Sequence, residues 1–174
     1  MLKIVTIAVV MAVLSLMHFA CSNKTSTSPV SAYQMGSDIV FTKQGNSDQY
    51  KKNGWSVSED SLTWVEGKSA SLVMKLENRT NTGDIVMRAV CYPYIAKGGT
   101  QIVGIKINGR DVGKWEIRDV GQGAQQVSFD AELVTNDIAV IDFSVPNALR
   151  PSDVDRKSSE GRELGVAFMT LKLF

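Results

Sequence analysis

Apolar and polar residues alternate along most of this chain. From Asp38 onward, apolar residues recur at about every second position in runs at 72–76, 85–91, 103–107, 112–117, 127–131, 139–145 and 167–173. A period of two is typical of strands with one buried face. About eight short strands separated by turns indicate packed antiparallel sheets. The pattern therefore predicts an all-β domain over residues 38–174, an antiparallel two-sheet sandwich of jelly-roll type.

Turn-forming residues separate these runs, and the clearest turn is Asn108-Gly109. Both residue types tolerate the positive φ that a type I′ turn requires, so the pair predicts a tight hairpin between two strands. Outside the N-terminus, no stretch sustains a period of 3.6 long enough to indicate a helix.

The N-terminus has a different pattern. Lys3 precedes an uncharged apolar run from Ile4 to Met17, and the small residue Ala20 follows shortly afterwards. A charged start, a short apolar stretch and a small residue are typical of a secretory signal. A membrane-spanning helix needs about 20 apolar residues, and this run is shorter. We therefore expect residues 1–20 to be a signal peptide that forms a helix.

The junction Ala20-Cys21, with a Ser- and Thr-rich stretch after it, resembles a bacterial lipoprotein signal. The resemblance implies that Cys21 receives a lipid and anchors the protein to a membrane. Ser22 after the cysteine implies the outer membrane of the cell envelope, with the domain facing the periplasm or the surface. His18 departs from the usual pattern, which has leucine or a similar residue there, so an ordinary signal or anchor is the alternative. Residues 21–37 are polar and predict a flexible tether.

The charge balance limits the classes of partner. Removal of the signal takes away Lys3, which leaves 18 of the 19 basic residues against 18 acidic ones. Without a basic excess, nucleic acid is not expected as a partner. The single histidine, His18, lies in the signal, so the mature chain cannot use imidazole for catalysis or metal binding. Cys91 shares a strand face with apolar residues and is expected to be a buried, inert thiol.

Two tryptophans in a polar stretch are the candidate ligand contacts. Trp55 and Trp64 are nine residues apart, and Glu59 lies between them. An aromatic face can stack on the apolar face of a sugar while nearby polar groups bind its hydroxyls. The alternative is that both indoles pack over the edge of the sandwich.

Carboxylates offer two further alternatives. Asp153 and Asp155 lie in a loop that could hold a structural calcium ion, or their charges could pair with nearby basic residues. Two carboxylates facing each other across a bond could also hydrolyse a glycan. No cofactor or catalytic residue is predicted.

The order of several short motifs resembles one family. The shared positions are Gly54, Trp55, Ser56, Glu59, Trp64, Gly67, Ala70, Asn108, Gly109, Pro146, Asn147, Pro151, Arg162, Leu164 and Gly165. Over residues 38–174 they resemble the β-sandwich domain that accompanies glycosyltransferases and glycerol-phosphate transferases of bacterial surface-polysaccharide synthesis. The resemblance implies a jelly-roll similar to carbohydrate-binding modules, without carrying over any catalysis. It also suggests that Arg162 approaches Glu59 beside the indoles, either as part of a sugar site or as a buried latch.

The sequence thus predicts a non-enzymatic envelope lipoprotein that binds surface polysaccharide or glycolipid through Trp55, Glu59, Trp64 and Arg162. A structural or assembly lipoprotein that recruits another envelope protein is the alternative, and a carboxylate-based hydrolase is a third. Exposed tryptophans would favour glycan binding, whereas buried tryptophans with an exposed apolar edge would favour a protein partner.

Overall fold

The computed structural model describes residues 29–80, 82–118, 121 and 123–174. The predicted signal peptide and Cys21 lie outside the described residues. Within the described part of the chain, no helix is long and apolar enough to cross a membrane.

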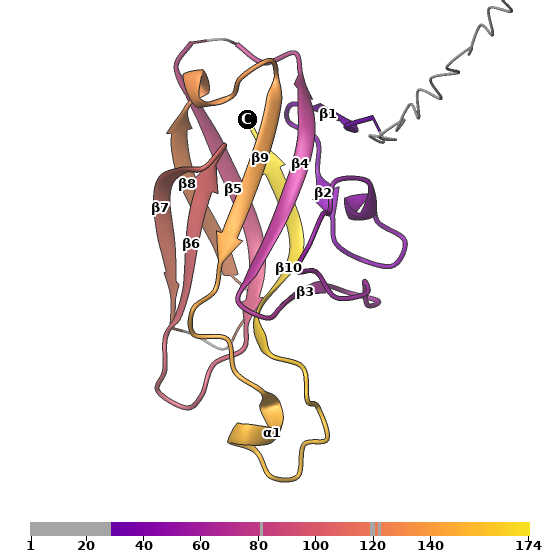
Figure 1. Cartoon of the computed structure of the whole chain (residues 1–174), viewed down its shortest axis with the longest axis vertical. Coiled ribbons are helices and arrows are strands. Elements are labelled where there is room, and N and C mark those ends of the chain that lie inside the picture. The colour runs from indigo at the N-terminus through magenta and orange to yellow at the C-terminus, as the bar shows by residue number, and fades with distance from the viewer. Residues whose placement is uncertain (1–28, 81, 119–120, 122) are drawn as a thin grey trace, which may run out of the picture.

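The chain folds into two stacked β-sheets (Figure 1). The first sheet has the order β1–β4–β9–β6–β7, formed by Ala32–Gln34, Ser69–Glu77, Ile138–Ser144, Gln101–Ile107 and Arg110–Ile117. The second has the order β2–β10–β5–β8, formed by Ile39–Val40, Leu164–Leu173, Asp84–Pro93 and Gly123–Asp130. Strand β3, Thr63–Glu66, also pairs with β10. These pairings confirm the predicted all-β sandwich, and every one is antiparallel except that of β1 with β4.

Helical structure among the described residues is confined to single turns. They are two 3₁₀ turns at Ser47–Gln49 and Ala131–Leu133 and a short helix, α1, at Pro151–Val154. Helix α1 belongs to the connection between β9 and β10 and lies beyond one end of the sandwich (Figure 1).

The core lies between the inner faces of the sheets, where most of the alternating apolar residues are buried as predicted. In β10 a register shift between Phe168 and Thr170 interrupts the alternation, so Phe168 lies in the core and Ala167 outside it. Phe143 of β9 and Phe168 of β10 meet across the two sheets with ring centroids 4.8 Å apart. Trp115 of β7 packs against both rings and is buried. Cys91 is buried on the same inner face of β5 as Met87 and Ala89, which confirms the expected environment of its thiol.

The prediction that residues 21–37 form a flexible tether is wrong for its last part. Strand β1 pairs with β4, and its Tyr33 is fully buried. The Tyr33 hydroxyl donates to the backbone oxygen of Ser37 at 2.6 Å and accepts from the backbone nitrogen of Leu173 at 2.9 Å. A buried ring with both hydrogen-bonding functions used fixes this segment to the sandwich. The described part of the domain therefore includes β1, ahead of residue 38.

The predicted hairpin joins β6 and β7. Asn108 and Gly109 have φ values of 47° and 80°, as a type I′ turn requires. The Asn108 side chain also donates to the backbone oxygens of Leu133 and Ile138 at 2.8 and 2.9 Å. These bonds tie the hairpin to the segment that leads into β9.

Candidate functional site

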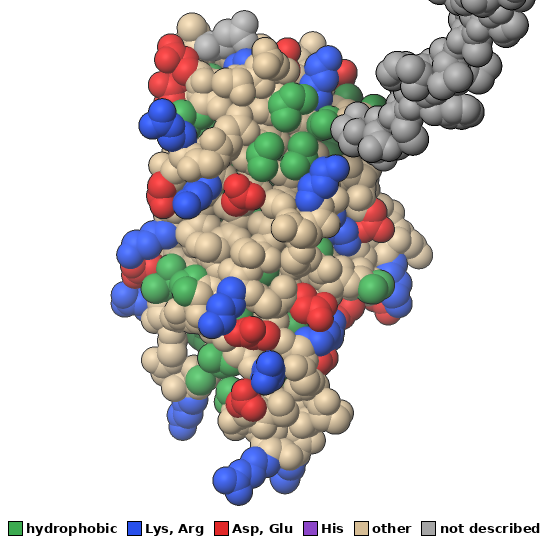
Figure 2. Space-filling model, in the orientation of Figure 1, with side chains coloured by type: hydrophobic (Ala, Val, Ile, Leu, Met, Phe, Trp, Pro, Cys, Tyr) green, Lys and Arg blue, Asp and Glu red, His purple; other side chains and the backbone are tan. Residues whose placement is uncertain are grey.

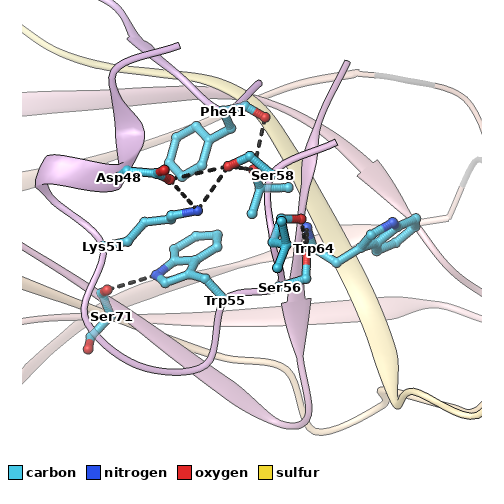
Figure 3. Close-up of polar contacts among 10 residues, drawn as sticks. Phe41, Asp48, Lys51, Trp55, Ser56, Ser58, Trp64 and Ser71 are labelled. Atoms are coloured by element: carbon cyan, nitrogen blue, oxygen red, sulfur yellow. Dashed lines mark hydrogen bonds and ion pairs between the residues drawn. The ribbon is translucent and has the colours of Figure 1, made fainter. Parts of the chain in front are cut away.

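The two tryptophans lie on opposite faces of the sheet that contains β3. Trp55 forms an isolated β-bridge with Val65, so both side chains point to the inner face. Trp64 precedes Val65 along the strand and therefore points to the outer face. Figure 3 shows the two indoles directed away from each other.

Trp55 closes the core. Its ring centroid is 5.1 Å from that of Phe41, 5.3 Å from Phe168 and 6.1 Å from Phe143. Its Nε1 donates to the backbone oxygen of Ser71 at 2.8 Å (Figure 3). The ring thus packs between the two sheets and its polar atom is used. Trp55 is partly buried and packs against the core, away from the outer face on which Trp64 lies.

A polar network fixes the segment around Trp55 (Figure 3). Lys51 Nζ lies 2.7 Å from Asp48 Oδ1 and donates to Ser58 Oγ at 2.9 Å. The hydrogen bond from Lys51 is the main reason that the pKa of Asp48 lies below its usual value. Thr63 Oγ1 lies 2.9 Å from the backbone oxygen of Phe41 and 3.0 Å from Ser58 Oγ, the two acceptors within reach of its one proton. These bonds hold the start of β3 against the sandwich and set the direction of Trp64.

On the outer face, Trp64 is the centre of a second aromatic cluster, which we call the aromatic patch. It consists of Leu62, Trp64, Tyr92, Tyr94, Leu164 and Ala167. Tyr92 and Tyr94 stand edge-on to the indole, with centroid distances of 6.2 and 6.3 Å and interplanar angles of 82° and 80°. This is the geometry that aromatic rings favour.

The strand register explains the aromatic patch. Ala167 of β10 pairs with Trp64 on one side and with Tyr92 on the other. The small Ala167 side chain leaves room for the large rings that flank it. Trp64 is only 8% exposed, whereas Tyr92 is 37% exposed and Tyr94 is half-buried. Trp64 therefore supports the patch, and the tyrosines provide its accessible surface. The sequence pattern did not single out either tyrosine as a candidate contact.

Three charged residues, the ionic rim, border the aromatic patch. Arg162 lies 2.6 Å from Glu160 Oε2 and 3.6 Å from Glu59 Oε1. The suggested approach of Arg162 to Glu59 is thus present. Their side chains are 34% and 46% exposed, so the pair is not a buried latch. The rim adjoins the patch because Glu59 donates its backbone N–H to the oxygen of Leu62 at 2.8 Å.

Glu160 of the ionic rim is poorly suited to act as a general acid. Hydrogen bonds from the Arg162 side chain and backbone lower the pKa of Glu160 to about 2. A general acid needs a carboxyl group with a raised pKa, so that it keeps its proton near neutral pH. Glu160 has the opposite property, because the guanidinium stabilises its charged form. The rim can instead donate and accept hydrogen bonds with a polar ligand.

The residues proposed for calcium do not converge. Asp153 lies in α1, and Asp155 accepts from the backbone nitrogen of Lys157 at 2.9 Å. Within the described ranges, no three His, Cys, Asp or Glu side chains are grouped so that they could hold a metal ion.

Comparison with known proteins gives likeness in fold alone. No family model matches the chain, and no curated protein matches it significantly in sequence. The C-terminal CBM6 of LamC, a marine laminarinase from Zobellia galactanivorans, has a TM-score of 0.45 at 8% identity, over 79% of this chain and 97% of that one. A CBM36 module in complex with calcium and xylotriose has a TM-score of 0.41 at 12% identity, over 79% and 99%.

A β-glucosidase from Paenibacillus barengoltzii is also similar, with a TM-score of 0.40 at 11% identity over 62% of this chain. The match spans 10% of that enzyme. At such scores and identities the similarities concern the fold and do not extend to a ligand or an activity.

Proposed function

We propose that the protein is a non-enzymatic carbohydrate-binding module whose contact surface is the aromatic patch together with the ionic rim. The observation that carries the proposal is the position of Tyr92 and Tyr94. They pack against Trp64 outside the main core. We further propose that a lipid on Cys21 anchors the module to the outer membrane. There the module contacts surface polysaccharide or glycolipid.

The chemistry of the patch matches the chemistry of a sugar. A pyranose ring has an apolar C–H face that stacks on an aromatic ring, and its hydroxyls need hydrogen-bond partners. Tyr92 supplies the accessible ring surface, and its hydroxyl group can both donate and accept. Arg162 supplies donors, and the carboxylates of Glu59 and Glu160 supply acceptors. Trp64 keeps the tyrosine edges in place.

The proposal is tested by titrating the full-length chain with surface polysaccharide from the producing cell and following intrinsic fluorescence. We expect saturable binding that Tyr92→Ala weakens by about tenfold, a loss of about 1.4 kcal/mol. Phe174→Ala is the matched control, because Phe174 is an aromatic side chain, 52% exposed, that follows the other end of β10. Its affinity should stay within about twofold of the original. Equal affinities for Tyr92→Ala and the original chain would refute the assignment of the site.

One observation favours the alternative of a protein partner. Trp64 is nearly buried, and buried tryptophans were expected for an assembly lipoprotein. The large exposed apolar residues of the described chain, however, lie on separate elements: Val30, Val57, Tyr92, Val154 and Phe174. Apolar residues exposed singly do not form a docking surface. The geometry therefore supports glycan contact better than protein recruitment.

A further inference from the structure

A groove crosses the outer face of the first sheet, on the side of the sandwich opposite to the aromatic patch. Its volume is about 320 Å³, and its lining comes from β4, β9, β6 and β7 and from the segment ahead of β3. We call it the polar groove, because polar side chains line it: Asn53, Ser71, Lys106, Asp111, Asp142 and Ser144. Figure 2 shows this face, with a band of uncharged surface across its middle and charged side chains along the border of the band.

Strand register places polar residues of the groove side by side. Ser71 of β4 pairs with Asp142 of β9, which pairs with Lys106 of β6. On its other side, Lys106 pairs with Asp111 of β7. Residues that pair directly share a face of the sheet, and neighbouring strands lie about 4.8 Å apart. The row therefore crosses about 14 Å of the outer face, which is longer than a single sugar ring.

A bulge in the β6–β7 pairing brings Asp111 to this face. Trp115 and Ile117 of β7 are buried on the inner side, and an unbroken alternation would direct Asp111 inward as well. The register shifts next to Lys106, so Asp111 instead faces outward beside Lys106 and is exposed. Bulges commonly re-aim a side chain in this way. The local fold thus adds a second carboxylate to the groove.

Small residues form the floor of the polar groove. Gly104 of β6 pairs with Ser144 of β9, and Ser144 pairs with Ser69 of β4. A Cβ atom on Gly104 would lie 2.5 Å from Ser144 Oγ, so a larger residue would intrude on the floor. The intervening residues Ile105 and Phe143 are fully buried, with their side chains on the inner face. They therefore add only backbone to the lining.

The charged groups of the groove are accessible to a ligand. Lys106 and Asp111 are exposed, and Asp142 is half-buried. None of the ion pairs among the described residues includes any of the three. At one end of the row, Ser71 donates its hydroxyl to Asn53 Oδ1 and so orients the Asn53 amide. The groove thus offers carboxylates as acceptors, an ammonium and an amide as donors, and hydroxyls that do both.

This set of groups matches a polyhydroxyl chain. Each sugar hydroxyl both donates and accepts, and the row presents donors and acceptors in alternation. Two carboxylates against one ammonium disfavour an anionic ligand such as nucleic acid. An extended peptide would need pockets for its alternate side chains, whereas the apolar side chains of the strands that form the groove point inward. A glycan therefore fits the groove better than either polymer.

We infer that the polar groove is a second glycan-binding site, so that one molecule bridges two glycan chains. The bridging rests on the proposed function, because the other chain must bind at the aromatic patch. The two surfaces lie on the outer faces of opposite sheets, so chains bound to them are separated by the core. The volume of the groove lies within the range of ligand sites, about 300–1,000 Å³.

The first test counts the sites with short oligosaccharides released from the cell's surface polysaccharide by partial acid hydrolysis. Titration calorimetry of the full-length chain should give two sites per molecule. Asp142→Ala should weaken the groove by about tenfold or more, because hydrogen bonds to charged groups are the stronger ones. Lys106→Ala, at an exposed position that tolerates substitution, should act in the same way. Tyr92→Ala should weaken only the other site. Glu132→Gln is the matched control, since Glu132 is an exposed carboxylate on the turn Ala131–Leu133, outside both surfaces, and it should keep both sites.

The second test measures bridging with the intact polysaccharide. Light scattering should show large assemblies with the original chain and with Glu132→Gln. A variant with one working site can coat a chain but cannot join two chains. Asp142→Ala and Tyr92→Ala should therefore each abolish the assemblies while still binding the polysaccharide.

The outcomes separate this inference from the proposed function. A single site that Tyr92→Ala weakens, and that Asp142→Ala and Lys106→Ala leave unchanged, overturns the inference and leaves the proposed function standing. Assemblies that persist undiminished in Asp142→Ala overturn it as well. A single site with the opposite response refutes the assignment of the aromatic patch, and the bridging with it. If neither the oligosaccharides nor the intact polysaccharide bind, the proposed function and the inference both fail.

Discussion

Replacement of Trp55 tests whether this indole closes the core. Its ring lies among Phe41, Phe143 and Phe168, which come from both sheets, and its Nε1 donates to the backbone oxygen of Ser71. Trp55→Ala would remove the ring from between the sheets and leave a cavity. Because Trp55 is partly rather than fully buried, we expect the free energy of unfolding to fall by about 3 kcal/mol, the lower end of the usual cost of removing a large aromatic side chain from a core.

The two contributions of the indole can be separated with Trp55→Phe. This change keeps a ring in contact with the three phenylalanines and removes the N–H donor. The Ser71 oxygen still accepts from the backbone nitrogen of Lys52 at 3.0 Å, so it does not lose all its partners. The lost hydrogen bond should cost about 0.5–1.5 kcal/mol. The smaller ring adds a further loss, and the total should stay well below that of Trp55→Ala.

Urea denaturation followed by far-UV circular dichroism measures both variants. Thermal unfolding gives a second reading, since about 1 kcal/mol corresponds to about 2–4 °C in a chain of this size. Val57→Ala is the control, because its exposed side chain should change stability by less than about 0.5 kcal/mol. A loss of less than about 1 kcal/mol in Trp55→Ala would show that the ring is not held between the sheets.

Three further predictions follow from single residues. Gly54 and Gly67 both have positive φ, but a Cβ on Gly54 would lie 1.8 Å from a backbone oxygen of β4 while Gly67 faces open space. Gly67→Ala should therefore lower the free energy of unfolding by about 1–2 kcal/mol. Gly54→Ala should lower it by clearly more, and thermal unfolding of both variants measures the difference. The pKa of Glu160 in the folded protein is about 2, below its usual value of 4.5. The contribution of the Glu160 carboxylate to stability is therefore complete above pH 4.5 and disappears as the pH falls towards 2. Titration by carbon NMR should show this pKa, and Arg162→Gln should raise it. Burial raises the pKa of the Cys91 thiol, so the peptide that contains Cys91 should resist iodoacetamide, as followed by mass spectrometry, until the protein unfolds.

Much of the fold could be predicted from the sequence because burial follows local alternation. In β5, Ile85, Met87, Ala89 and Cys91 are buried and the residues between them are more exposed, as the period of two required. The Asn108-Gly109 turn was equally predictable, since its positive φ angles are a local property of those residues. Strand β1 was not predictable in this way, because three residues with one inward side chain are too short to show a period.

The candidate site was less predictable because it depends on contacts between strands that are distant in sequence. The nine-residue spacing of the tryptophans did not reveal that Trp55 pairs with Val65, which places the two indoles on opposite faces. Tyr92 looked like an ordinary outward-facing residue of its strand. It becomes part of a patch only because β3 and β5 flank β10 on its two sides, which brings Tyr92 and Trp64 around Ala167.

Strand β10 connects the aromatic patch to the core. On its inner face Phe168 packs in the core, and on its outer face Ala167 forms the base of the aromatic patch. Near its start, Gly165 allows a close approach to β9, since a Cβ there would lie 2.3 Å from Val145 Cγ1. One backbone, paired with β5 and β3, therefore fixes the aromatic patch relative to the core. Because strands inside a sheet carry the patch rather than a free loop, a ligand that stacks on its tyrosines meets a surface already in place, and little of its binding energy is spent on ordering the protein.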